Sequence, residues 1–211
     1  MSSEKTKIST PKGSLQYVNV SGKGKIDYDG KYFEYTAGII LDKKKADKFY
    51  AEILEFFNTN KPSWFKHNEP CNKIRRVQDD DKLSLFQFKT KTEFSVEGGD
   101  VRKTKIRVMN SKNIEVDLPE NEGIGNGSLG RISGSMSIHS DKRSKTAGVS
   151  LWLNNVQILK YVKFVADTGF DADEEGEFTG FDDTSNSFAE DKKSKKDKKS
   201  KKDRNLKKIE I

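Results

Sequence analysis

Residues 83–110 read LSLFQFKTKTEFSVEGGDVRKTKIRVMN, and their pattern is typical of β-structure. Its first half alternates apolar or aromatic side chains with polar ones, which is the period-two pattern of a β-strand. Glu97-Gly98-Gly99-Asp100 interrupts the alternation and is typical of a hairpin turn, after which residues 101–110 return as a second strand. The stretch therefore predicts two antiparallel strands.

Further strand signals lie on both sides of this hairpin. Toward the N-terminus, residues 15–20 (LQYVNV) predict a short strand, and residues 25–41 are rich in Tyr, Phe and Ile around an Asp-Gly hairpin turn. Toward the C-terminus, residues 114–118 predict a short strand and residues 123–140 a Gly-rich loop that leads into a bent strand. Residues 147–165 predict the last long strand, which brings the count to six or seven.

One helix interrupts the strands. Asp42 is a suitable N-cap, and apolar residues recur after it at spacings of three and four, which predicts an amphipathic helix packed on a core. These residues are Ala46, Phe49, Ile53, Phe56 and Phe57. Residues 61–81 follow as a long irregular connection. Six or seven strands with one inserted helix predict a mainly β protein, built as a small closed or half-closed barrel.

The charged residues are segregated along the chain. The 211 residues have a net charge of +7, with 32% hydrophobic and 35% charged residues. Residues 167–191 hold ten carboxylates and no Lys or Arg, residues 192–211 carry a net charge of +8, and residues 1–166 are left with +9. Segments so charged and so poor in apolar residues do not fold alone. We therefore expect a flexible N-terminus over 1–13, a folded domain over 14–166, a disordered acidic segment over 167–191 and a disordered Lys-rich tail over 192–211.

The few Cys and His residues exclude several classes of protein. Cys71 is the only cysteine, so the sequence predicts no disulfide framework and fits a reducing compartment. With only His67 and His139 beside it, we predict no metal and no cofactor. The chain has no P-loop sequence, and Cys71 with His67 is better explained as a chance pair than as a catalytic one, so we predict no enzyme. No apolar run approaches the ~18 residues of a membrane span, and no secretory signal is expected.

Cations and aromatic rings are interleaved in the central hairpin, which favours nucleic-acid binding. Period-two alternation places Gln87, Lys89 and Lys91 on one face of the strand. It places Phe86, Phe88 and Phe94 on the other face. We expect the Phe face in the core and the Lys face, on a domain of net charge +9, to follow a phosphate backbone. Because nothing resembles a recognition helix, single strands fit better than a duplex.

Five motifs follow one another in a specific order. They are YTAGIILD (35–42) ahead of the capped helix, FQFKTKTEF (86–94), VMNSKN (108–113), GNGSLGRISGSMSIHS (125–140) and AGVSLWLNNVQILKYV (147–162). In this order and spacing the chain resembles the single-stranded DNA-binding proteins of tailed bacteriophages. The resemblance implies an OB-fold barrel with a helix inserted between early strands, and a groove that binds single-stranded DNA with little sequence preference.

The resemblance also implies which residues bind DNA. It assigns the groove to Lys89, Lys91, Tyr32 and the region of His139. Relatives often have an aromatic residue at positions 91 and 139, so the stacking rings here are sought among Tyr32, Tyr35, Trp64 and Trp152. With the cations of the neighbouring strands, the predicted DNA-binding set is Tyr32, Tyr35, Lys89, Lys91, Arg102, Arg131 and His139.

The expected function is that of a non-enzymatic protein that coats and protects single-stranded replication and recombination intermediates in the cytoplasm of the infected bacterial host. The acidic segment carries Phe170, Phe178, Phe181 and Phe188, which we expect to contact the phage DNA polymerase or helicase–primase. We further expect no membrane association and consider a homodimer. Two alternatives stay open: a recombination annealing protein, and a basic structural or chaperone-like protein that binds acidic partners.

Overall fold

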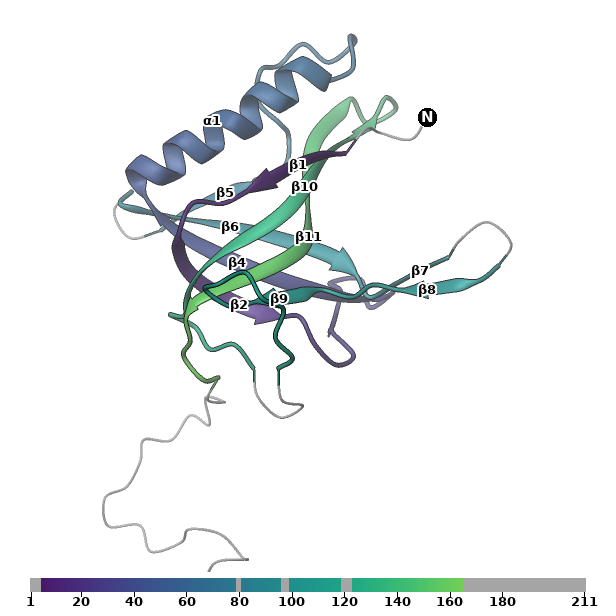
Figure 1. Ribbon diagram of the computed structural model, residues 1–211. Helices are drawn as coiled ribbons and strands as arrows, with labels where there is room; N and C mark the ends of the chain where they lie inside the picture. Colours follow the sequence, from purple (N-terminus) through teal and green to yellow (C-terminus); the bar gives the residue numbers. More distant parts are fainter. Residues whose placement is uncertain (1–4, 79–80, 96–98, 119–122, 165–211) are drawn as a thin grey trace, which may run out of the picture. The chain divides into compact units, whose positions relative to one another are not determined.

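A closed β-barrel forms the centre of the computed structural model, which describes residues 5–78, 81–95, 99–118 and 123–164 (Figure 1). Each of its five strands pairs with the next, and the last pairs again with the first; in ring order they are β2 (Gly13–Asn19), β4 (Phe33–Asp42), β6 (Leu83–Lys91), β11 (Thr146–Lys160) and β10 (Leu129–Asp141). The pairing of β6 with β11 is parallel and the others are antiparallel. A closed barrel of five strands is the architecture of the OB fold.

Short strands extend the barrel at its edges. They are β1 (Thr6–Ser9) beside β10, β3 (Lys25–Ile26) beside β4, β5 (Arg75–Gln78) beside β6 and β9 (Arg107–Met109) beside β11. A separate two-stranded sheet joins β7 (Glu93–Ser95) to β8 (Val101–Lys103), and Figure 1 shows this hairpin extending away from the barrel. The mainly β, OB-like fold predicted from the sequence is confirmed.

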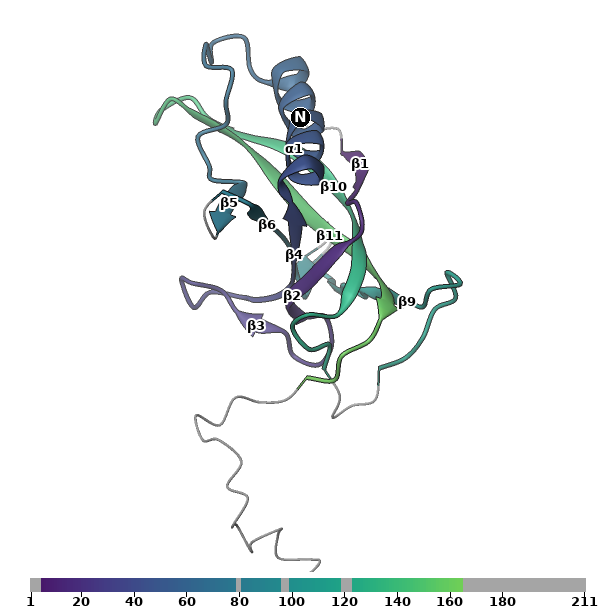
Figure 2. The same ribbon diagram turned by 90° about the vertical axis from the view of Figure 1, so that its left-hand side faces the viewer.

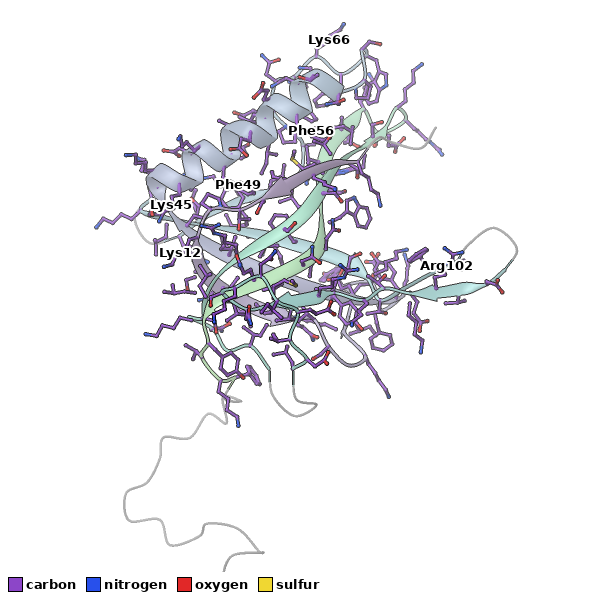
Figure 3. The ribbon with its side chains drawn as sticks, viewed as in Figure 1. Lys12, Lys45, Phe49, Phe56, Lys66 and Arg102 are labelled. Carbon is purple, nitrogen blue, oxygen red and sulfur yellow. The ribbon has the colours of Figure 1, made fainter. Side chains whose placement is uncertain are left out.

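The single helix described, α1 (Lys43–Asn60), follows β4 and precedes β5 in the chain, and it lies across one end of the barrel in both views (Figures 1 and 2). The predicted N-cap is confirmed, since the Asp42 carboxylate accepts a hydrogen bond from the backbone N–H of Lys45 at 3.0 Å. All five residues of the predicted apolar stripe are buried. Figure 3 shows Phe49 and Phe56 on the side of α1 that faces the barrel, where the Phe49 ring packs edge-on against Phe86 at 5.0 Å between centroids.

Gly134 allows β10 to bend into the barrel. The register between β10 and β11 shifts between Ser133 and Gly134. A Cβ atom at Gly134 would lie 2.2 Å from the carbonyl oxygen of Trp152 and 2.8 Å from a ring carbon of Phe88, so no larger residue fits. The bent strand predicted from the glycines of this segment is therefore confirmed.

Several segments differ from the sequence prediction. The flexible N-terminus expected over residues 1–13 is wrong for residues 6–9, which form β1 because Ile8 is buried and the segment pairs with β10. Each strand of the predicted central hairpin is divided in two. The first breaks at Thr92 into β6 and β7, and the second breaks after residue 103 into β8 and β9.

The breaks occur because the hairpin leaves the barrel at Thr92. Its backbone N–H donates to the carbonyl of Phe33, while its own carbonyl accepts from Thr104. Residues 114–118 form only an isolated bridge, between Glu115 and Met109, and the connection 61–81 contains β5. The predictions for residues 167–191 and 192–211 lie outside the described residues.

Candidate nucleic-acid interface

The outer surface of β4 and β6 carries polar side chains above a phenylalanine core. Phe86 and Phe88 are fully buried, whereas Lys89 and Lys91 are exposed, so the predicted alternation along β6 is confirmed. The prediction that Phe94 shares the buried face is wrong, because Phe94 lies on β7, in the hairpin that leaves the barrel, and is 47% exposed. Opposite the two lysines on β4, Thr36 pairs with Lys89 and Glu34 pairs with Lys91. Cross-strand partners project from the same face of a sheet, so these four side chains share the outer face of the barrel.

A groove runs over this outer face. A narrower part of about 320 Å³ lies among Tyr32, Lys91, Trp152 and the connection 72–74. A wider part of about 900 Å³ lies between the strands and the loop that links β2 to β4. The two parts share the residues Glu34, Arg76, Gln87 and Lys89, so they form one continuous hollow, which we name the β4–β6 groove.

The floor of the β4–β6 groove holds an ion pair. Lys89 Nζ lies 2.8 Å from Glu34 Oε1, and only 9% of the Glu34 side chain is exposed, against 49% of the Lys89 side chain. A carboxylate so buried requires a partner, because leaving it unpaired would cost its desolvation energy. Lys89 is therefore already neutralised in the free protein. Among the described residues, the groove cations without an ion pair to a carboxylate are Lys25, Lys73, Arg76 and Lys91.

Two aromatic rings of the groove lie beside lysines. Lys91 Nζ lies 4.2 Å from the centroid of the Tyr32 ring, which is a cation–π contact. Lys5 Nζ lies 5.1 Å from the centroid of the Trp152 ring, whose Nε1–H donates to Ser137 Oγ at 2.7 Å. The hydrogen bond fixes the indole, so the groove presents a positioned ring and a second ring that is 39% exposed at Tyr32.

Two further tyrosines of the groove were missed by the sequence analysis. Tyr28 lies in the loop between β3 and β4 and is fully exposed, and Tyr17 lies on β2 with 61% of its surface exposed. Tyr17 has a φ of 51°, in the left-handed region, where the register of β2 with β4 is irregular. Bulges of this kind re-aim side chains beside binding sites. A hydrogen bond from the Tyr17 N–H to Asn126 Oδ1, 2.9 Å long, supports this backbone.

The predicted site residues fall into separate groups. Tyr32, Lys89 and Lys91 lie together in the groove. His139 lies at its margin, with Nδ1 3.1 Å from Oγ of Ser150, a residue that lines the groove. Burial lowers the pKa of His139 below its ordinary value, so its ring is uncharged at neutral pH. Tyr35 faces the inner side of β4, and its hydroxyl donates to the carbonyl of Gly22 at 3.0 Å.

The other predicted residues lie away from the groove. Arg102 is on β8, in the hairpin that extends from the barrel (Figure 3), and Arg131 is exposed on β10 opposite Gln157. Trp64 packs edge-on against Phe65 at 5.9 Å, near the end of α1. The predicted partner-binding residues Phe170, Phe178, Phe181 and Phe188 lie outside the described residues. The structure therefore brings together three of the seven predicted DNA-binding residues, with His139 beside them.

Across the described ranges, no three Cys, His, Asp or Glu side chains gather as a metal site. The helix in those ranges is not long and apolar enough to cross a membrane.

A five-stranded OB-like barrel with a groove across two adjacent strands defines the structural class of the chain. Its fold is similar to that of gp2.5, a single-stranded DNA-binding protein encoded by bacteriophage T7, with a TM-score of 0.58, 18% identity and coverage of 84% of this chain and 100% of that one. It is also similar to the single-stranded DNA-binding protein from bacteriophage Enc34, with a TM-score of 0.52, 13% identity and coverage of 78% and 87%.

A third solved structure, the Enc34 protein in complex with single-stranded DNA, matches with a TM-score of 0.52, 14% identity and coverage of 74% and 87%. No family model and no curated protein sequence matches the chain. The chain therefore has the fold of phage single-stranded DNA-binding proteins, as its sequence motifs predicted.

Proposed function

We propose that the protein binds single-stranded DNA in the β4–β6 groove, without reading base sequence. The observation that carries the proposal is the groove itself, where Lys91 and Tyr32 lie in contact beside Trp152 on the face of β4 and β6. Oligonucleotides bind OB folds on this face, between the loops that flank it. Basic side chains with rings beside them suit an unpaired strand, since its bases are free to stack while its phosphates meet cations.

The groove offers each part of a single strand a matching group. Lys73, Arg76 and Lys91 attract the phosphates, and each contact releases counterions, which makes binding sensitive to salt. The rings of Tyr32, Trp152 and Tyr28 are available to bases. A phosphate that approaches Lys89 must compete with Glu34 for the ammonium group, so this cation contributes less than its position suggests.

The wider role that we propose is to coat and protect single-stranded intermediates of phage replication and recombination, without catalysis, in the cytoplasm of the host. The acidic segment 167–191 is the proposed contact for a polymerase or a helicase–primase, since its four phenylalanines lie among ten carboxylates. The composition of this segment predicts disorder, and aromatic residues in a disordered segment suit binding that is coupled to local ordering.

Comparison of single strands with a duplex tests the proposed function. The full chain should bind a single-stranded oligonucleotide more tightly than a duplex of the same length at moderate salt, because a duplex hides its bases from Tyr32 and Trp152. Fluorescence anisotropy at several salt concentrations measures both affinities, and an RNA of the same sequence reports the preference between DNA and RNA. Equal or tighter binding of the duplex would refute the proposal.

The charged C-terminal segments should act on DNA binding in opposite directions. A chain that ends at Asp191 loses a net charge of +8 and should bind single strands more weakly than the full chain. A chain that ends at Ala166 also loses the ten carboxylates, which repel phosphates, and should bind more tightly than the chain that ends at Asp191. The difference should shrink as salt shortens the Debye length from about 10 Å at 0.1 M to about 3 Å at 1 M. Equal affinities of the two truncated chains at low salt would contradict this expectation.

A further inference from the structure

The β7–β8 hairpin is not one of the strands that close the barrel. Its two strands pair only with each other, as a sheet separate from that of the barrel. All six of their residues are exposed, including Phe94 and Val101. A two-stranded hairpin that buries neither face adds little to the stability of the protein, so its exposed residues are available for ligand binding.

One face of this hairpin continues into a basic hollow of about 520 Å³. The register pairs Glu93 with Lys103 on that face and Phe94 with Arg102 on the opposite one. Glu93 and Lys103 line the hollow together with the loops on either side of β3, which contribute Lys23 and Lys31. The hollow thus carries three lysines and one carboxylate on its lining, and Lys31 also pairs at 3.3 Å with Asp29 on the exposed surface.

The basic hollow adjoins the narrower part of the β4–β6 groove at one residue, Tyr32. Tyr32 lines both, and Lys91 covers its ring from the side of the groove. Phe33, which is 45% exposed, lies next to Tyr32 in the hollow. The alternation of cations and exposed rings that suits a single strand therefore continues beyond the groove.

We propose that the hollow formed by Lys23, Lys31 and Lys103 holds a second segment of the same single-stranded DNA, so that the β7–β8 hairpin lengthens the binding site. The inference rests on the proposed function of the groove. A strand that leaves the groove at Tyr32 meets these three lysines next, and Phe33 offers the next ring. Polyanionic DNA is the occupant that the charge of the hollow fits, since positive side chains outnumber its single lining carboxylate.

The test combines a triple variant of the full chain with oligonucleotides of two lengths. Lys23→Ala, Lys31→Ala and Lys103→Ala together remove the cations of the hollow, and all three side chains are exposed or partly exposed. The matched control is Lys43→Ala, Lys44→Ala and Lys48→Ala, which removes the same charge from exposed positions of α1, outside the groove and the hollow. Each is titrated with a short oligonucleotide of about 5 nucleotides and a longer one of about 15, near the two ends of the range of OB-fold site sizes.

The hollow variant should bind the short oligonucleotide as the unaltered chain does, but lose affinity for the longer one. Its salt slope for the longer one should fall by about 2, because each lost phosphate contact lowers the slope by ~0.7. The control should keep the slope within experimental error. A hollow variant that keeps the full slope, or one that loses no more than the control, would overturn the proposal. If the unaltered chain bound neither oligonucleotide, the proposed function itself would fail instead.

Discussion

Lys89→Ala should destabilise the barrel and weaken DNA binding together. The substitution leaves the carboxylate of Glu34, of which 9% is exposed, without its partner on the floor of the groove. A buried group left unpaired in this way costs about 1–3 kcal/mol. For a domain of this size each kcal/mol corresponds to about 2–4 °C in Tm, so thermal denaturation should show a fall of several degrees. Lys91→Ala is the matched control, since Lys91 contacts a ring rather than a carboxylate and should leave Tm unchanged.

Substitution of Glu34, the partner of Lys89, separates the effect on stability from the effect on DNA binding. Glu34→Gln releases Lys89 from its ion pair, so single-stranded DNA should bind more tightly and the salt slope should rise by ~0.7, the value of one phosphate contact. The double variant Glu34→Gln with Lys89→Ala should recover most of the stability that Lys89→Ala loses, because no buried charge is then left unpaired. If the double variant is as unstable as Lys89→Ala alone, the ion pair is not the reason for the loss.

The ion pair between Glu34 and Lys89 could not be predicted from the sequence. The alternation of Phe86, Phe88, Lys89 and Lys91 is a local pattern, and it gave the correct face for each residue. Glu34 lies 55 positions before Lys89, and only the pairing of β4 with β6 brings the two together. On the sequence alone, Lys89 and Lys91 are equivalent groove cations. In the structure one is neutralised and the other is free to meet a phosphate.

The positions of some aromatic residues follow from the local sequence pattern, whereas those of others depend on residues far away in the sequence. Tyr35 lies two and four positions before Ala37 and Ile39, which are buried. Since alternate residues of a strand share one face, the sequence pattern predicts that Tyr35 also points inward. Tyr17 is different, because its outward position depends on an irregular pairing with β4 and a hydrogen bond to Asn126, 109 positions away. Strand β1 was missed because Ile8 is a lone apolar residue in a polar segment, and it is ordered only by its pairing with β10.

Tyr32→Ala should lower the affinity for single-stranded DNA without unfolding the barrel. Loss of one base–ring stack costs about 1–3 kcal/mol, which corresponds to a loss of affinity of roughly 5-fold to 150-fold. The backbone of Tyr32 is held independently of the ring, since its N–H donates to Asp27 Oδ1 at 3.1 Å and its carbonyl accepts from the Asp27 N–H at 2.9 Å. The matched control is Tyr161→Ala, because Tyr161 is 41% exposed, close to the 39% of Tyr32, and does not line the groove.

Salt dependence and fluorescence identify the cause of that loss. Stacking releases few counterions, so a plot of log affinity against log salt for Tyr32→Ala should run nearly parallel to that of the unaltered chain, whereas loss of a phosphate contact changes the slope. Trp152 lines the same part of the groove and Trp64 does not, so the tryptophan fluorescence change on DNA binding should disappear in Trp152→Phe and persist in Trp64→Phe. A fluorescence change that persists in Trp152→Phe would show that the bases do not reach this end of the groove. In that case the single strand would have to stack on Tyr17 and Tyr28, in the wider part.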